Sequence, residues 1–394
     1  MILSWNICSL HRTLLIYVFS LLIRQRESAL QIIPESKWRA SAERHCDRVK
    51  RLAGGSLESL DPGNPITNFL FKYYFWKPAA VAQYSAGAGK VLLGASFEEM
   101  PKSGSQRRAL PYNDPDSAAE GVTGHYFDAS TCSLKTLLSF QATLELLETV
   151  QERSPSYSCY GLHEWAMLYV DEEKKNVTKE EQARHQSLPL RLSQEALNTV
   201  VRGGSHNTSH HTCSPTSPAF HPRIRCTHYD AFRFFTPDAV PLNFLPPSAL
   251  GRGGPGRATA QLNYEQPGCV HATMDLFKYA MKLHPWCSSE LVADCLELAR
   301  DARLLDMRAS PYDLQHLTEK QRRCYGKGSE EAPYTYFDVS PIKIESWQGR
   351  GKYVQLQESI YRRALPLRRR LIREYSLFLE DAKAGSSGTC PLLD

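Results

Sequence analysis

The chain has 394 residues with a formal net charge of +5 at pH 7, and 42% of its residues are hydrophobic. This composition is typical of a globular protein with a buried core, and the mild positive charge permits an anionic partner without requiring one. The eleven cysteines are odd in number and include no Cys-x-x-Cys pair, which excludes a disulfide framework and a zinc ribbon. We therefore expect an intracellular, reducing compartment.

Residues 1–30 carry an apolar run, Thr13–Ile23, between Arg12 and Arg24. Its eleven residues are too few to span a bilayer, which needs about 20, so we expect no stable membrane span. The run suits the apolar part of a signal peptide, and the absence of acids before Glu27 equally suits a presequence that targets an organelle. A wrongly assigned start codon is a third interpretation, and we leave this segment out of the fold.

Hydrophobic periodicity predicts a mainly α-helical fold, with one multi-helix domain over residues 36–382 and minor extended segments. We expect loop insertions at 101–120, 203–222, 251–260 and 318–333, a disordered tail at 383–394, and a strand pair or extended turn over 334–347. The oligomeric state is left open. The expected helices are 36–52, 64–76, 133–151, 192–201, 270–283, 289–307 and 353–381.

The helix over 270–283 has one apolar and one polar face. Its apolar positions recur at helical spacing, and its other face is ionisable. The apolar face comprises Val270, Met274, Phe277 and Met281, and the polar face comprises His271, Asp275, Lys278 and Lys282. Because His271 and Asp275 lie four residues apart on one face, they are the first candidates for catalytic residues.

The helix over 289–307 carries a stripe of four carboxylates, which repel one another unless cations lie nearby. Three sources of positive charge are open: mobile salt in solvent, Lys278 and Lys282 of the preceding helix, or a metal ion. The stripe comprises Glu290, Asp294, Glu297 and Asp301.

Two further pairs of a histidine and an acid are candidate sites. His163 and Glu164 begin an otherwise apolar segment, so they must find partners once buried. His228 and Asp230 lie among aromatic residues. Each pair is either a catalytic base or ligand pair or a hydrogen-bonded part of the core.

Aromatic and basic residues suggest where a nucleic acid would bind. Tyr73, Tyr74 and Trp76 lie in a dense aromatic segment that would either line a pocket for a flat ligand or belong to the core. A row of arginines would hold phosphates or form a solvated helix face. The candidate phosphate-binding residues are Arg308, Arg362, Arg363, Arg369 and Arg373.

Several segments between about residues 36 and 380 resemble a family whose bacterial and plant members carry the name 3-methyladenine DNA glycosylase. The matching segments include Asn68–Tyr74, Leu188–Ser193, Glu265–Asp275 (EQPGCVHATMD), Ser289–Cys295 and Leu305–Leu314 (LDMRASPYDL). The resemblance implies a hydrolase of DNA base-excision repair that removes alkylated purines, with DNA as partner and no cofactor. It implies stacking of the extruded base on Tyr73, Tyr74 and Trp76, and Asp230 or Asp275 as the acid. The chain lacks the Leu-Pro-Gly-Val-Gly turn and the Cys/His zinc arrangement of well-characterised glycosylases.

Two alternatives remain open. One is a helical metalloenzyme that uses the three pairs as nitrogen and oxygen ligands, although Glu-x-x-His is absent. The other is a non-catalytic nucleic-acid-binding protein that uses the arginine row. Convergence of the three pairs in the folded chain would indicate a site, whereas scattering would favour solvated surface.

Overall fold

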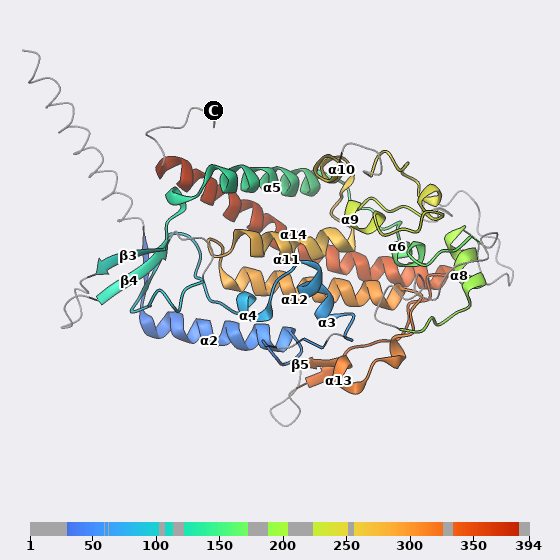
Figure 1. Cartoon of the computed structure of the whole chain (residues 1–394), viewed down its shortest axis with the longest axis horizontal. Coiled ribbons are helices and arrows are strands. Elements are labelled where there is room, and N and C mark those ends of the chain that lie inside the picture. The colour runs from blue at the N-terminus through green and yellow to red at the C-terminus, as the bar shows by residue number, and fades with distance from the viewer. Residues whose placement is uncertain are drawn as a thin grey trace, which may run out of the picture.

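The computed structural model describes residues 30–58, 60–61, 63–101, 107–112, 122–171, 188–203, 224–250, 256–325 and 334–385. Its centre is formed by α11 (Val270–Leu283) and α12 (Ser289–Ala309), which pack side by side, with α14 (Trp347–Gly385) packed against both (Figure 1). On one side α5 (Leu134–Glu152) lies along α14, and on the other α2 (Glu35–Leu52) lies along α12.

Local sequence signals explain where these helices begin. The Ser288 side chain accepts a hydrogen bond from the backbone N–H of Leu291, and Ser133 caps α5 by accepting from Thr136. Such caps satisfy N–H groups that have no partner inside the helix. Apolar side chains of the central helices are then fully buried, as at Phe277, and burial of each large side chain contributes about 1.5–3 kcal/mol.

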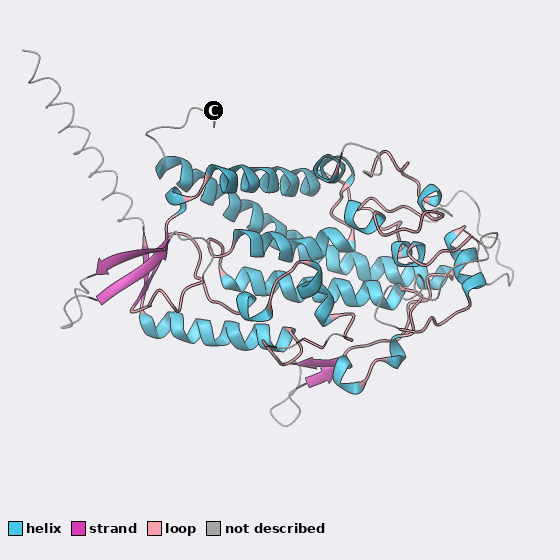
Figure 2. Cartoon of the chain, viewed as in Figure 1, coloured by secondary structure: helices cyan, strands magenta, loops and turns pink. Residues whose placement is uncertain are grey.

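A four-stranded sheet lies at one end of the helical body (Figure 2). Its strand order is β1-β2-β4-β3, in which β1 runs parallel to β2 and the other pairs are antiparallel. A second, two-stranded sheet pairs β5 with β6. The strands are β1 (Gln31–Ile33), β2 (Lys90–Leu93), β3 (Arg107–Tyr112), β4 (Val122–Phe127), β5 (Arg323–Tyr325) and β6 (Tyr334–Tyr336).

Short helices connect these elements and carry many of the polar residues discussed below. The α-helical ones are α3 (Thr67–Tyr73), α4 (Pro78–Val81), α6 (Leu162–Ala166), α8 (Gln194–Val201), α9 (Tyr229–Phe232), α10 (Arg257–Tyr264) and α13 (Glu319–Arg322). Three 3-10 turns are η1 (Ala129–Thr131), η2 (Val240–Leu242) and η3 (Leu314–His316).

The mainly α-helical fold class is confirmed. Among the described helices, none combines the length and the apolar character that a membrane span requires.

Three of the expected insertions are partly wrong, because each contains regular structure. The segment 101–120 contains β3, 251–260 contains the start of α10, and 318–333 contains α13 and β5. The expected insertion at 203–222 lies outside the described residues after position 203, as do most of 1–30 and of the tail 383–394.

The carboxylate stripe of α12 is neutralised by arginines of two neighbouring helices. Arg48 of α2 contacts Asp294 at 2.7 Å and Glu297 at 2.6 Å. From α14, Arg363 contacts Asp301 at 2.7 Å and Arg370 approaches Glu290 at 3.6 Å. Among the described residues the stripe therefore pairs with Arg48, Arg363 and Arg370, rather than with Lys278 and Lys282.

Candidate metal centre

The histidines of the three predicted pairs converge in the core, from α6, α11 and the residue before α9. The ring of His271 on α11 lies 4.5 Å from the ring of His163 on α6, measured between centroids. On its other side, His271 stacks on His228, which precedes α9, at 4.9 Å. Three segments far apart in the sequence thus bring three imidazole rings into contact.

Two groups of ligand atoms form around these rings. We name the first the Asp306 triad, which comprises His163, His271 and Asp306. All three residues are buried, and one ligand atom from each lies within 4.8 Å of the other two. His163 Nε2 and Asp306 Oδ1 approach to 2.8 Å, which is the distance of an ion pair when the ring is protonated. The angle of this contact departs from that of a good hydrogen bond, and a cation shared with His271 would satisfy both atoms.

Cysteine sulfurs fix which nitrogen of these rings faces the triad. His163 Nδ1 lies 3.4 Å from Cys159 Sγ, and His271 Nδ1 lies 4.0 Å from Cys269 Sγ. The contact at Nδ1 of His163 leaves Nε2 directed toward Asp306. Metal-binding histidines in general hold an outer partner on the ring nitrogen that does not coordinate.

Charge also distinguishes the two histidines of the Asp306 triad. Although burial acts to lower it, the nearby Asp306 and Cys159 raise the pKa of His163 well above its usual value. Burial, together with the neighbouring His163 and His228, holds the pKa of His271 well below its usual value. His271 is therefore neutral at pH 7, which is the form that binds a metal ion, whereas the His163 ring is protonated beside Asp306 and would release a proton to an incoming ion.

A buried arginine orients the carboxylate of this triad. Arg303 is 1% exposed, and its Nη1 lies 2.6 Å from Glu164 Oε1 and 3.0 Å from Asp306 Oδ2. Its guanidinium plane also lies 3.9 Å from the ring centroid of Phe69. Because Arg303 holds Oδ2, the other oxygen of Asp306 is left directed at His163. An outer-shell contact of this kind positions a ligand.

We name the second group the Asp275 triad, which comprises His228, Glu265 and Asp275, all buried. His228 Nε2 lies 3.7 Å from Glu265 Oε2 and 3.8 Å from Asp275 Oδ2, and neither nitrogen of its ring has a hydrogen-bond partner. Those distances are too long for hydrogen bonds. The histidine ring is thus at ion-pair distance from two carboxylates, and although burial acts to lower it, Glu265 and Asp275 raise the pKa of His228.

Both carboxylates of the Asp275 triad have other partners. Asp275 Oδ1 accepts from the Tyr74 hydroxyl at 2.6 Å, and Oδ2 accepts from Lys278 Nζ at 2.6 Å. Burial opposes ionisation of Asp275, but Lys278 and His228 overcome it and hold the pKa of this carboxyl far below its usual range. Glu265 Oε2 accepts from the Gln261 side chain at 3.1 Å, and burial raises the pKa of Glu265.

Of the six residues predicted as catalytic, four lie in the two triads: His163, His228, His271 and Asp275. Glu164 contacts Arg303 instead. Asp230 pairs with Arg257 and lies 3.7 Å from Arg233, so it faces arginines.

The residues predicted to stack on a base lie beside the Asp275 triad. Tyr74 donates to Asp275, as described above. The Tyr73 ring stacks on Phe69 at 5.2 Å and meets Tyr74 edge-on at 5.0 Å, and Trp76 packs against the apolar core. These rings contact other aromatic and apolar side chains, and none of them lines the cavity bordered by Trp38 and Tyr84.

The predicted phosphate-binding arginines divide into two sets. Arg308 contacts Asp338 at 2.7 Å, Arg362 contacts Glu358 at 2.6 Å, and Arg363 contacts Asp301 at 2.7 Å. Arg369 and Arg373 are exposed on α14 and have no acidic partner in the part of the chain that the structure describes. Of the five predicted arginines, Arg369 and Arg373 are thus the two whose charge no described acid neutralises.

Sequence reasoning missed four residues of the centre: Cys159, Glu265, Arg303 and Asp306. One signal in the sequence marks the region. Cys226-Thr-His228 and Cys269-Val-His271 repeat the pattern Cys-x-His, and Cys159 precedes His163 by four positions. Each histidine of the centre thus follows a cysteine closely.

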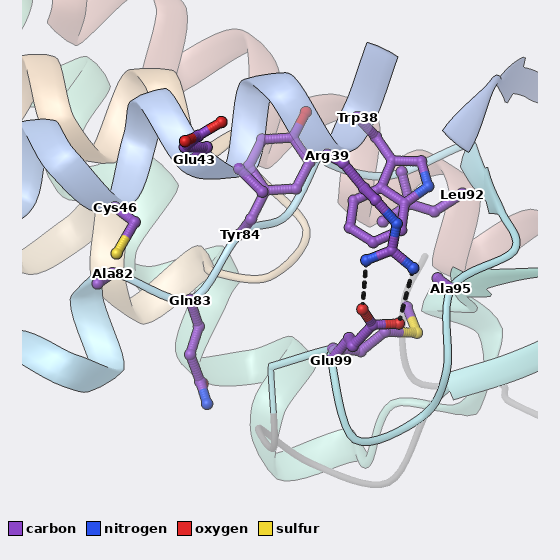
Figure 3. Close-up of a pocket in the computed structure, with 12 residues that line it drawn as sticks. Trp38, Arg39, Glu43, Cys46, Ala82, Gln83, Tyr84, Leu92, Ala95 and Glu99 are labelled. Carbon is purple, nitrogen blue, oxygen red and sulfur yellow. Dashed lines mark hydrogen bonds and ion pairs between the residues drawn. The ribbon is translucent and has the colours of Figure 1, made fainter. Parts of the chain in front are cut away.

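A cavity of about 370 Å³ lies away from both triads, between α2, β2 and the segment that follows α4 (Figure 3). Trp38 and Tyr84 contribute aromatic walls, and Arg39 crosses the opening to Glu99 at 2.5 Å. No residue of the Asp306 or Asp275 triad lines it. The charged pair at its opening, Arg39 and Glu99, is already neutralised, so we place the candidate chemistry at the triads.

Comparisons with known protein families, with curated proteins and with solved structures give no match.

Proposed function

We propose that the chain is a metal-dependent enzyme that binds one divalent first-row transition ion at the Asp306 triad. The observation that carries this proposal is the clustering of His163, His271 and Asp306, all buried, with one ligand atom of each within 4.8 Å of the other two. A cation shared by the three atoms would satisfy all of them at once.

The donor set suits particular ions. Two imidazoles and one carboxylate are the protein ligands of non-haem Fe(II) centres and of many catalytic Zn(II) sites, and three ligands leave open positions for water or substrate. An ion held there would act as a Lewis acid or activate a bound small molecule. In this arrangement Cys159 orients His163, and Arg303 orients Asp306.

Metal analysis tests the proposal. Purified full-length protein is stripped with chelator, incubated in turn with Fe(II) under anaerobic conditions and with Zn(II), desalted, and analysed by inductively coupled plasma mass spectrometry. We expect one ion per chain for the wild type and at least about tenfold weaker binding for Asp306→Asn. Asp294→Asn is the matched control, because Asp294 lies on the surface of the same helix and pairs with Arg48. The proposal fails if the wild type retains neither ion, or if Asp306→Asn binds as tightly as the control.

Removal of alkylated bases from DNA is the second candidate function. The resemblance in sequence supports it, and so does the anionic Asp275 beside Tyr73 and Tyr74. A glycosylase needs a carboxylate to activate water or to stabilise the sugar cation, next to aromatic rings that hold the extruded base.

Release of methylated base from alkylated duplex DNA, followed by chromatography, tests this second function. The expected result is release by the wild type, persistence in excess chelator, and loss in Asp275→Asn. Absence of release by the wild type would exclude it. Salt-dependent DNA binding without release would instead favour a non-catalytic nucleic-acid-binding protein. In that case the double variant Arg369→Gln/Arg373→Gln weakens binding and lowers its salt dependence, whereas Arg362→Gln, which removes a paired arginine, changes it little.

A further inference from the structure

The Asp275 triad has the size and burial of a second metal site. Its three ligand atoms lie within 4.8 Å of one another, as those of the Asp306 triad do. Ligands about 2.0–2.2 Å from one ion lie roughly 3–4 Å apart, and His228 Nε2 lies 3.7 Å and 3.8 Å from the two carboxylates. The spacing is that of groups arranged around a cation.

A cation of the chain itself lies at the edge of this triad. Lys278 Nζ is 2.6 Å from Asp275 Oδ2, which is the same oxygen that faces His228. The lysine lies three residues along α11 from Asp275, and its ammonium group lies 4.6 Å from the ring centroid of Tyr279. The side chain is only 23% exposed, so the ammonium group is held at the edge of the triad rather than in open solvent.

The two triads therefore differ in how their carboxylates meet a neighbouring cation. In the Asp306 triad, Arg303 contacts Oδ2, and the oxygen facing His163 contacts no lysine or arginine among the described residues. In the Asp275 triad the lysine takes the very oxygen that faces the histidine. A divalent ion on that oxygen would lie next to the ammonium group, and the two positive charges would repel strongly in a buried setting.

We propose that the Lys278 ammonium group, held on the Asp275 oxygen that faces His228, keeps a divalent ion out of the Asp275 triad, and that its removal opens a divalent metal site on His228, Glu265 and Asp275. The expected number of ions in the wild type rests on the proposed function. We therefore expect one ion per chain in the wild type and two ions per chain when a neutral residue replaces Lys278. The second site takes Zn(II), since a histidine and two carboxylates are all ligands of that ion.

The number of bound Zn(II) ions per chain tests this inference in full-length protein. We expect one ion in the wild type and two in both Lys278→Gln and Lys278→Met, with the added ion lost again in Lys278→Gln/Asp275→Asn. Lys278→Arg keeps a cation at this position and should bind one ion. Lys282→Gln is a second control, because Lys282 lies one turn further along α11 and donates to Ser139 and Thr143 instead.

A double variant separates this inference from the proposed function. Asp306→Asn/Lys278→Gln lacks a ligand of the Asp306 triad, so one ion should bind, at the Asp275 triad. If the wild type binds no ion while Lys278→Gln binds one, the proposed function fails and this inference stands. If neither Lys278→Gln nor Lys278→Met gains an ion over the wild type, the inference is overturned, whatever the wild type binds.

Discussion

Replacement of Arg303 by methionine should be among the most destabilising single changes in this chain. The guanidinium group is fully buried and contacts two carboxylates, Glu164 at 2.6 Å and Asp306 at 3.0 Å. Methionine has an unbranched apolar side chain that can fill much of the space of the arginine stem. The substitution removes the positive charge. The substitution therefore leaves two buried carboxylates without their shared cation.

The expected loss in the free energy of unfolding equals the smallest free-energy cost of leaving these carboxylates buried without Arg303. Breaking a buried ion pair by removing one partner costs about 3–5 kcal/mol. One carboxylate can instead take up a proton. At pH 7 this costs about 1.36 kcal/mol for each pH unit above its ordinary pKa of about 4, which is roughly 4 kcal/mol. The two routes agree, so we expect Arg303→Met to lower the free energy of unfolding by about 4 kcal/mol at pH 7.

Urea unfolding in the presence of chelator, followed by circular dichroism, measures this loss. At pH 5 the protonation route costs only about 1.4 kcal/mol, so the difference between variant and wild type should shrink by more than half. Arg48→Met is the control. Arg48 also contacts two carboxylates, but it lies at the partly exposed surface, where such pairs contribute about 0–1 kcal/mol. A loss below about 1 kcal/mol for Arg303→Met, or an equal loss at both pH values, would refute the reasoning.

Two further predictions concern the backbone before α6 and a buried histidine. Gly161 has φ +76°, and an added Cβ would lie 3.2 Å from Ala309 Cβ, so Gly161→Ala should cost at least about 1–2 kcal/mol in thermal unfolding. Gly351→Ala on α14 meets no atom within 4 Å and should instead stabilise by up to about 1 kcal/mol; equal effects would contradict the strain argument. Burial lowers the pKa of His284 from 6.5 to about 4, so the stability from its neutral ring is present above pH 6.5 and is lost as pH falls toward 4. That loss is about 3 kcal/mol, and His284→Asn should reduce this part of the pH dependence; an unchanged profile would show that other groups cause it.

The central helices could be predicted because their signals are local. The spacing of apolar residues over 270–283 and the cap at Ser288 determine α11 and the start of α12, and the structure has both there. The partner of the carboxylate stripe could not be predicted in this way. Arg48 lies 246 residues before Asp294 in the sequence, and no local pattern links them. The strand β3 was missed for the same reason, since it forms by pairing with β4.

The candidate site could be predicted only in part. Its histidines stand out in apolar segments, and their convergence was the condition set for a site. Asp306 did not stand out, because an acid near the end of a helix that carries four other acids looks like solvated surface. Its burial results from the packing of α6 against α12, where Glu164 meets Arg303 across 139 residues of sequence.

Residue spacing in the sequence cannot distinguish the two triads from each other. Each triad contains an aspartate with a cation three residues away on its own helix, Arg303 before Asp306 and Lys278 after Asp275. From sequence, both are ordinary helical ion pairs. The difference lies in which carboxylate oxygen the cation takes: Arg303 holds the oxygen turned away from the histidine, and Lys278 holds the one turned toward it. Under the two proposals, Asp306 can share an external ion with His163 whereas Asp275 cannot while Lys278 is present, and only the positions of individual atoms separate the two triads.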